Sequence, residues 1–178
     1  SVDNALMGQS DLGISWMDYS KTITLDCDIH NNGTKSRVNG FLSPVHDTIM
    51  LKIDADRLNI GFLNKKVGAF LSDIDGYANG TAYIIGGWRR IDLAGSLALH
   101  CSTRVKANNV VYSFMGDTVR LSPGSIVLSD IGIKDRNGNR GRLTGKLNHN
   151  HFGNWTCDIN ADVRNMLVYD TQDFSVMP

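Results

Sequence analysis

Apolar and polar residues alternate one by one along most of this chain. The clearest runs lie at residues 23–29, 91–99, 110–114, 126–133 and 143–147. Because successive side chains of a β-strand point to opposite faces, each run predicts a strand with one apolar face and one polar face. The alternation therefore predicts an all-β chain.

Residues that favour tight turns separate these runs. They stand at Asn31-Asn32-Gly33, Gly86-Gly87, Lys106-Ala107-Asn108-Asn109, Ser122-Pro123-Gly124 and Asn137-Gly138-Asn139. Asn and Gly accept a positive φ, and Pro presets a turn conformation. The last segment lies between two alternating runs, so it predicts a tight hairpin.

Helical spacing of apolar residues is scarce. The best candidate covers residues 57–71, where Leu58, Phe62, Leu63, Val67 and Phe70 lie near a helical period. Gly61 and Gly68 lower the helix propensity of this stretch. The pattern leaves one short helix near residues 57–71 open.

A short glycine-centred motif recurs, in which an aliphatic residue stands two positions before a glycine and Leu or Ala two positions after it. It occupies Val38–Leu42, Ile74–Ala78, Leu93–Leu97 and Leu143–Leu147. A glycine at an inward strand position permits a bulge, a bend or close approach of a neighbouring backbone. Strands bent in this way build a sandwich, a barrel or an open trough, and the pattern does not choose among the three.

The charge balance excludes one class of function. The 178 residues contain 18 Lys and Arg and 18 Asp and Glu, a formal net charge of +0. A nucleic-acid binder needs a basic surface to neutralise phosphates, so we expect no nucleic-acid partner. The chain shows no signal peptide and no run of apolar residues long enough to span a bilayer. Its length suits a single domain.

The three cysteines do not form a recognisable metal motif. Cys27, Cys101 and Cys157 each stand at an apolar position of an alternating run. We interpret them as small hydrophobic residues of the buried face rather than as reactive thiols. A disulfide is not excluded, although the sequence selects no pair.

Two polar segments have the residue types of metal sites. His149 and His151 are expected on one strand face, but no third ligand is identifiable, so we interpret them as polar turn residues. Residues 135–139 have the polar spacing of a calcium loop without its downstream Glu. A hairpin turn explains this segment better, and no metal is expected.

Carboxylate pairs are the remaining candidates for catalysis. Asp26 and Asp28 flank Cys27, and Asp73 and Asp75 flank Ile74, so each pair is expected to share a strand face. Alternating charges on the solvated face of a strand explain both pairs more simply than acid–base chemistry. No nucleophile, zinc-protease, phosphate-loop or dinucleotide motif is present. The sequence therefore predicts a protein that is not an enzyme and uses no cofactor.

An ordered set of motifs between Gly76 and Thr171 resembles the C-terminal half of TamB-like proteins, within the wider AsmA-like family of Gram-negative envelopes. The motifs are the glycine strand starts at Gly95 and Gly145, Val111-Tyr112-Ser113-Phe114, Ile126 to Asn139, Leu143 to His149 with Phe152, and Leu167-Val168-Tyr169-Asp170-Thr171. The first 70 residues resemble the family much less.

The resemblance implies an interior segment of a long periplasmic protein that is anchored in the inner membrane. It implies an extended, curved sheet folded lengthwise into a trough with an apolar interior. This trough is associated with phospholipid transport to the outer membrane, and the protein with a translocation and assembly module that includes an outer-membrane barrel partner. The implied ligands are phospholipid acyl chains or an apolar client.

The alternating runs assign the residues that would line such a groove. They are Ile91, Leu93, Leu97, Leu99, Val110, Tyr112, Phe114, Val119, Leu121, Ile126, Leu128, Leu143 and Leu147. Lipid tails match an aliphatic surface without specific hydrogen bonds, so a lipid groove needs no conspicuous polar motif.

Two other functions fit the same pattern. In the first, a scaffold pairs through its strand edges with an outer-membrane barrel protein or a client and carries no lipid. In the second, a closed sandwich binds carbohydrate or acts as an adhesive module. The second requires exposed aromatic residues on one face, and Trp16, Trp88 and Trp155 are widely separated in sequence.

Overall fold

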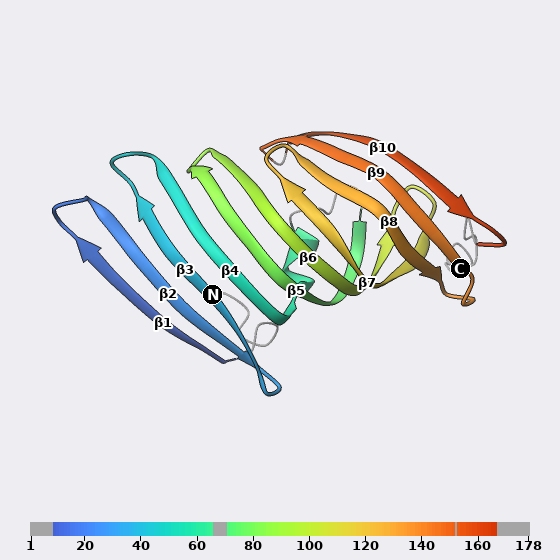
Figure 1. Ribbon diagram of the computed structural model, residues 1–178, viewed down its shortest axis with the longest axis horizontal. Helices are drawn as coiled ribbons and strands as arrows, with labels where there is room; N and C mark the ends of the chain where they lie inside the picture. The colour runs from blue at the N-terminus through green and yellow to red at the C-terminus, as the bar shows by residue number, and fades with distance from the viewer. Residues whose placement is uncertain (1–8, 66–70, 152, 167–178) are drawn as a thin grey trace, which may run out of the picture.

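The computed structural model describes residues 9–65, 71–151 and 153–166. In this part of the chain, ten strands form one antiparallel sheet in which each strand pairs with its neighbours in sequence (Figure 1). The strands are β1 (Gln9–Met17), β2 (Thr22–Asn31), β3 (Thr34–Ser43), β4 (Thr48–Asn59), β5 (Leu71–Gly87), β6 (Arg90–Val105), β7 (Val110–Ser122), β8 (Ser125–Asp135), β9 (Arg140–Asn150) and β10 (Gly153–Val163). The predicted all-β fold is confirmed. The sheet is open, with β1 and β10 at its two edges.

Four of the five predicted turns lie at a junction between consecutive strands. Gly86 and Gly87 instead end β5 and pair with Ile91 and Arg90, so the turn falls at residues 88–89. Asn137-Gly138-Asn139 joins β8 to β9 as the predicted hairpin, with Lys134 opposite Arg140 as the last pair. The turns at residues 18–21 and 44–47 were not predicted, although Pro44 is a residue that favours turns.

The short helix left open near residues 57–71 is present but covers less of this stretch than the apolar spacing does. Helical structure in the described part of this stretch is one 3₁₀ segment, η1 (Gly61–Lys65), while residues 66–70 lie outside the described residues. Leu58 and Asn59 belong to β4 and pair with β5, so cross-strand hydrogen bonds replace helical ones. Within the described residues no helix has the length and apolar character needed to cross a bilayer.

One row of directly opposed residues crosses the whole sheet and consists only of aliphatic residues, glycine and cysteine. In strand order from β1 to β10, this apolar row is Leu12, Cys27, Val38, Ile53, Ala82, Gly95, Leu121, Ile126, Leu147 and Cys157. Opposed residues of antiparallel strands project to the same side. We call the side that carries this row the apolar face.

The neighbouring row projects to the other side, which we call the polar face. In the same strand order it consists of Asp11, Asp28, Arg37, Asp54, Thr81, Ser96, Arg120, Val127, Lys146 and Asp158. A shift of one residue in register would exchange the two rows, so their contrast fixes the register of the sheet.

The recurring glycines allow neighbouring strands to approach closely. Gly40, Gly76, Gly95 and Gly145 all have positive φ, from +117° to +151°. A Cβ atom at any of them would lie 2.0–2.3 Å from a carbonyl oxygen of the adjacent strand. The register places all four on the apolar face, so the predicted close approach at an inward position is confirmed.

Bulges interrupt several strand pairs and increase the local twist. Register shifts with a residue of positive φ occur at Arg57 in β4, Asp73 in β5, Gly116 in β7, Asp130 in β8 and Asn154 in β10. At two of these bulges, a side chain of the neighbouring strand accepts a hydrogen bond from the amide of the residue with positive φ. The Arg57 amide donates to Asn79 Oδ1 at 2.7 Å, and the Asp130 amide donates to Thr144 Oγ1 at 3.2 Å.

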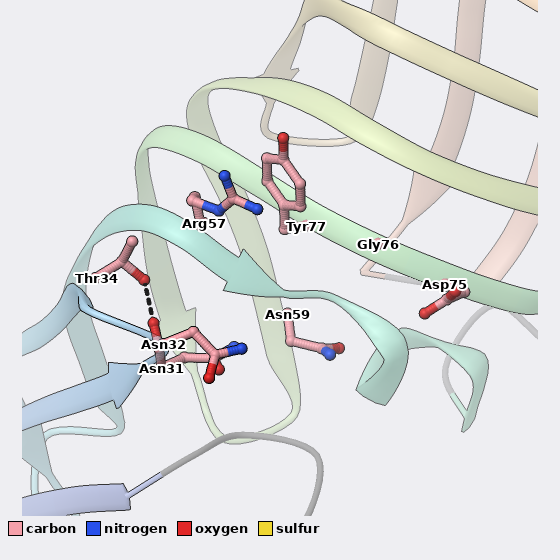
Figure 2. Close-up of a pocket in the computed structure, with 8 residues that line it drawn as sticks. All are labelled: Asn31, Asn32, Thr34, Arg57, Asn59, Asp75, Gly76 and Tyr77. Atoms are coloured by element: carbon pink, nitrogen blue, oxygen red, sulfur yellow. Dashed lines mark hydrogen bonds between the residues drawn. The ribbon is translucent and has the colours of Figure 1, made fainter.

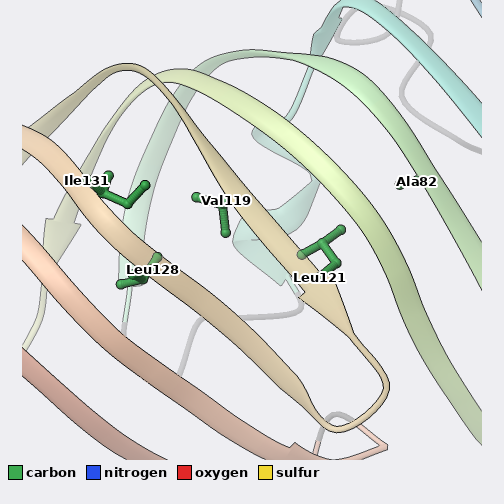
Figure 3. Packing of buried hydrophobic residues seen from close by; sticks show 5 residues of the cluster. All are labelled: Ala82, Val119, Leu121, Leu128 and Ile131. Atoms are coloured by element: carbon green, nitrogen blue, oxygen red, sulfur yellow. The ribbon is translucent and has the colours of Figure 1, made fainter.

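Burial is uneven along the apolar face. A cluster of buried residues from β5, β7 and β8 consists of Ala82, Val119, Leu121, Leu128 and Ile131, as Figure 3 shows. We call this set the core cluster. At the β1 edge of the sheet, by contrast, Leu12, Ile14 and Trp16 are 57%, 62% and 52% exposed. We call these three residues the open end of the apolar face.

Candidate functional site

All the residues assigned to a groove lie on the apolar face. Ile91, Leu93, Leu97 and Leu99 come from β6, Val110, Tyr112, Phe114, Val119 and Leu121 from β7, Ile126 and Leu128 from β8, and Leu143 and Leu147 from β9. The alternation of apolar and polar residues was sufficient to place these side chains on one face. A register shifted by one residue would have placed them on the opposite face of the sheet.

Many of these residues pack against one another within the protein. Val119, Leu121 and Leu128 belong to the core cluster, and Val110 is 0% exposed. Other assigned residues of β6 to β9, including Leu93 and Leu97, are half-buried and pack against the cluster. Over β5 to β9 the apolar face is thus largely covered by its own side chains, and less of it is accessible to a ligand than the sequence suggests.

The open end was not assigned from the sequence. Leu12, Ile14 and Trp16 alternate in the same way as the residues of β6, so the signal was present. Ile14 lies opposite Leu25, and Trp16 lies opposite Ile23, which continues the apolar face into β2. Together the three half-exposed side chains form a contiguous apolar patch, the kind of surface that is common at interaction sites.

A polar hollow lies beside the turn between β2 and β3 (Figure 2). Its volume is about 160 Å³, and it is lined by Asn31, Asn32, Thr34, Arg57, Asn59, Asp75, Gly76 and Tyr77. The Arg57 guanidinium lies 4.4 Å from the centre of the Tyr77 ring, which in turn stacks on His100 with centroids 5.0 Å apart. These contacts brace the bulge of β4 against β5 and β6.

The polar face carries paired charges. The guanidinium of Arg37 donates to both carboxylate oxygens of Asp26, at 3.0 and 2.6 Å, and Lys35 Nζ lies 2.8 Å from Asp28. The hydrogen bond from Arg37 lowers the pKa of Asp26 below its ordinary value. Asp26 and Asp28 therefore share a face, as predicted, and each has a cationic partner on β3.

The second carboxylate pair lies at a bulge of β5. Asp73 is the bulge residue of β5, with φ of +54°, so the strand alternation is interrupted between Asp73 and Asp75. The Asp73 carboxylate accepts a hydrogen bond from Arg104 Nε at 2.9 Å, whereas Asp75 lines the polar hollow. Because Arg104 and Asp75 both project to the polar face, nothing places the two carboxylates on opposite faces, and the bulge interrupts only the regular alternation between them.

The two histidines do not share a strand face, because the chain reverses at His151 between β9 and β10. His149 is buried, and its ring lies 4.8 Å from that of Trp155. Burial lowers the pKa of His149. Nδ1 of His151 lies 3.2 Å from a carboxylate oxygen of Asp92. The turn interpretation is confirmed for His151 and is wrong for His149.

Asp135 organises the hairpin between β8 and β9. One of its carboxylate oxygens accepts the amides of Asn137 and Asn139, both at 2.9 Å, and the other accepts Asn139 Nδ2 at 3.0 Å. A calcium ion would have to compete with these bonds. Among the described residues no group of three or more His, Cys, Asp or Glu is arranged to hold a metal ion.

All three cysteines are free thiols. Cys27 and Cys101 are half-buried, in agreement with their interpretation as small apolar residues. Cys157 lies on the apolar face but is exposed, because β10 is an edge strand. Its expected burial is therefore wrong. Burial raises the pKa of Cys101 from 9.0 to about 11.

We expect Cys101 to react with a maleimide far more slowly than Cys157 in the folded protein. At neutral pH, a pKa of about 11 leaves Cys101 roughly a hundredfold less thiolate than its ordinary value of 9.0 would, and Cys157 is the more exposed thiol. Half-burial slows the reaction further. Mass spectrometry after timed labelling resolves the three sites, and labelling in urea provides the control. Equal native labelling of Cys101 and Cys157 would contradict the burial of Cys101.

Comparison of the chain with protein-family models, with curated proteins and with solved structures gave no match. The resemblance to TamB-like proteins therefore rests on the motifs of the sequence alone.

Proposed function

We propose that the apolar face binds phospholipid acyl chains, as part of a TamB-like periplasmic trough that carries lipid from the inner to the outer membrane and assists outer-membrane protein translocation and assembly. One observation carries this proposal. The apolar row crosses all ten strands, and at β1 it ends in large side chains that are more than half exposed.

The apolar face over β1 to β4 has the dimensions of a lipid tail. Strands of a sheet lie about 4.8 Å apart, so β1 to β4 span roughly 14 Å. One leaflet of a bilayer contributes about 15 Å of hydrocarbon. A tail lying across these four strands would be desolvated at about 0.8 kcal/mol per buried CH₂, without any hydrogen bond. The core cluster leaves less room over β5 to β9, so we assign lipid contact chiefly to β1–β4.

A photoreactive amino acid tests this assignment. In place of Ile14, it is expected to crosslink to lipid when the protein is incubated with vesicles of phosphatidylethanolamine and phosphatidylglycerol. In place of Ser15, on the polar face of the same strand, it should yield little or no lipid adduct, and in place of Leu99 an intermediate amount. Mass spectrometry of the adducts provides the measurement. Equal crosslinking at Ile14 and Ser15, or none at either, would refute lipid binding by the apolar face.

A strand-edge scaffold for an outer-membrane barrel protein or a client is the second candidate. The observation in its favour is that the outer edge of β1 pairs with no other strand of the described chain. The two functions respond differently to Ile14→Asp. This change places a charge among lipid tails and should abolish lipid crosslinking, whereas backbone pairing along the edge should survive it.

A further inference from the structure

Three consecutive hairpin turns at one end of the strands carry large exposed side chains. The turns join β1 to β2 (residues 18–21), β3 to β4 (residues 44–47) and β5 to β6 (residues 88–89), and Figure 1 shows them along one side of the sheet. In these turns Tyr19, Val45 and Trp88 are 88%, 65% and 48% exposed. We call the three turns the exposed rim.

The turns at the opposite ends of the strands are polar. The turn between β2 and β3 is Asn32-Gly33, and residues 106–109 and 136–139 form the turns after β6 and β8. Phe62 of η1, 42% exposed, is the one large apolar side chain that the described connections at these ends expose. Exposed apolar turn residues are therefore concentrated on one side of the sheet.

Hydrogen bonds between neighbouring turns hold the exposed rim in place. Ser43, which ends β3 and is 2% exposed, donates its hydroxyl to the carbonyl oxygen of Lys21 at 3.1 Å. Oδ1 of Asp47 accepts the amide of Trp88 at 2.8 Å. The turn between β3 and β4 is thus tied to the turns on both sides of it. Since strands lie about 4.8 Å apart, the three turns follow one another at roughly 10 Å and span roughly 20 Å.

Positive charge adjoins the apolar side chains of the exposed rim. Arg89 and Arg90 are exposed, and within the described residues neither of them forms an ion pair. The two carboxylates of the rim already have partners, because Asp18 pairs with Lys21 and Asp47 accepts the amide described above. Two guanidinium groups therefore remain available to an anionic partner.

We propose that the exposed rim docks on an anionic bilayer surface. Tyr and Trp side chains favour the interface between lipid and water, because each has an apolar ring and a polar group. Cations close to such a surface are attracted by its phosphates. Three turns in one row can contact the same surface at once, which raises the affinity above that of a single turn. The rim shares no residue with the apolar face, so docking does not depend on the binding of lipid tails.

An environment-sensitive fluorophore tests the proposal. Cys27, Cys101 and Cys157 are replaced by Ala, and Val45→Cys is labelled with nitrobenzoxadiazole. The matched control is a label at Ala107→Cys, an exposed turn position at the opposite ends of the strands. Vesicles of phosphatidylethanolamine and phosphatidylglycerol should shift the emission of the label at position 45 to shorter wavelength and leave the label at 107 unchanged. Equal responses at the two positions, or no response at 45, would overturn the proposal.

Paired charge variants test the role of the two arginines. Arg89→Gln with Arg90→Gln should weaken binding to vesicles rich in phosphatidylglycerol roughly thirtyfold. The same loss of charge at the opposite ends of the strands, Lys106→Gln with Arg136→Gln, should leave binding unaltered. If both pairs weaken binding equally, the attraction belongs to the charge of the whole chain, and the exposed rim is not the docking surface.

Further variants separate docking from the binding of lipid tails and from self-association. Tyr19→Ser with Trp88→Ser should weaken vesicle binding at least tenfold, whereas Ile14→Asp should leave the response of the label at position 45 unchanged. Loss of that response in Ile14→Asp would assign the contact to the apolar face. The same spectral shift on concentrating the protein without vesicles would assign the rim to a second copy of the chain. Either result would overturn docking, while a response at 45 without a lipid crosslink at position 14 would refute tail binding alone.

Discussion

Replacing Gly95 by Ala is expected to lower the free energy of unfolding by roughly 2–6 kcal/mol, since a strained φ and overpacking each cost about 1–3 kcal/mol. Gly95 has a φ of +117°, and an added Cβ would lie 2.3 Å from the carbonyl oxygen of Thr81 and 2.9 Å from Cα of Ala82. These backbone atoms belong to β5, so the clash is relieved only if β5 and β6 separate. Urea denaturation followed by circular dichroism measures the loss.

Two other glycines separate the causes of this loss. Gly138 has a φ of +87° but no atom within 4 Å of an added Cβ, so Gly138→Ala should cost only the conformational strain of about 1–3 kcal/mol. Gly13 has neither a positive φ nor a close neighbour, and Gly13→Ala should be neutral or stabilise by up to about 1 kcal/mol. If Gly95→Ala lowers the free energy of unfolding by no more than Gly138→Ala does, the recurring glycines are not required for the close approach of neighbouring strands.

The glycine motif was predictable because glycine is the one residue that tolerates both the φ and the lack of space. The bulges were not predictable. Arg57, Asp73 and Asp130 adopt φ values of +51° to +55° without being glycine. The bulges are stabilised by partners distant in sequence, such as Asn79 for the Arg57 amide. A pattern read along one strand contains no signal for a hydrogen bond that the next strand supplies.

The face of each residue assigned to the groove was predictable, but its burial was not. Leu97 and Ile14 stand in equivalent alternating runs, so the sequence treats them alike. Leu97 packs against the core cluster, whereas Ile14 is 62% exposed in an edge strand. The difference depends on how far the sheet bends and on which strand lies at its edge. The motifs that resemble a known family begin at residue 76, so the resemblance gives no information about β1 to β4.

The contrast between packed and exposed parts of one face also constrains the function. Apolar side chains that already pack against one another gain little from a lipid tail, because their surface is no longer in contact with water. The core cluster therefore stabilises the curvature of the sheet, while the open end retains the surface that a ligand would cover. Substitutions in the core cluster should therefore change stability, and substitutions at the open end should change ligand binding.

Ile131→Ala is expected to lower the free energy of unfolding by about 2–5 kcal/mol, the usual cost of truncating a buried aliphatic side chain. Ile131 is 1% exposed and belongs to the core cluster. Ile14→Ala provides the matched control, with the same residue type on the same face. Because Ile14 is largely exposed, its truncation should change stability by less than about 0.5 kcal/mol.

Ile131→Ala should have the larger effect on stability, whereas Ile14→Ala should have the larger effect on lipid binding. With a photoreactive group at Leu25, opposite Ile14, the Ile14→Ala variant should give less lipid adduct, since it removes a neighbour that would cover the tail. Ile131→Ala, measured in buffer where it remains folded, should give as much adduct as the unmodified chain. If Ile131→Ala costs less than about 0.5 kcal/mol, the face is not packed over β8. If it instead removes the lipid adduct while the sheet stays folded, the ligand lies over the core cluster rather than at the open end.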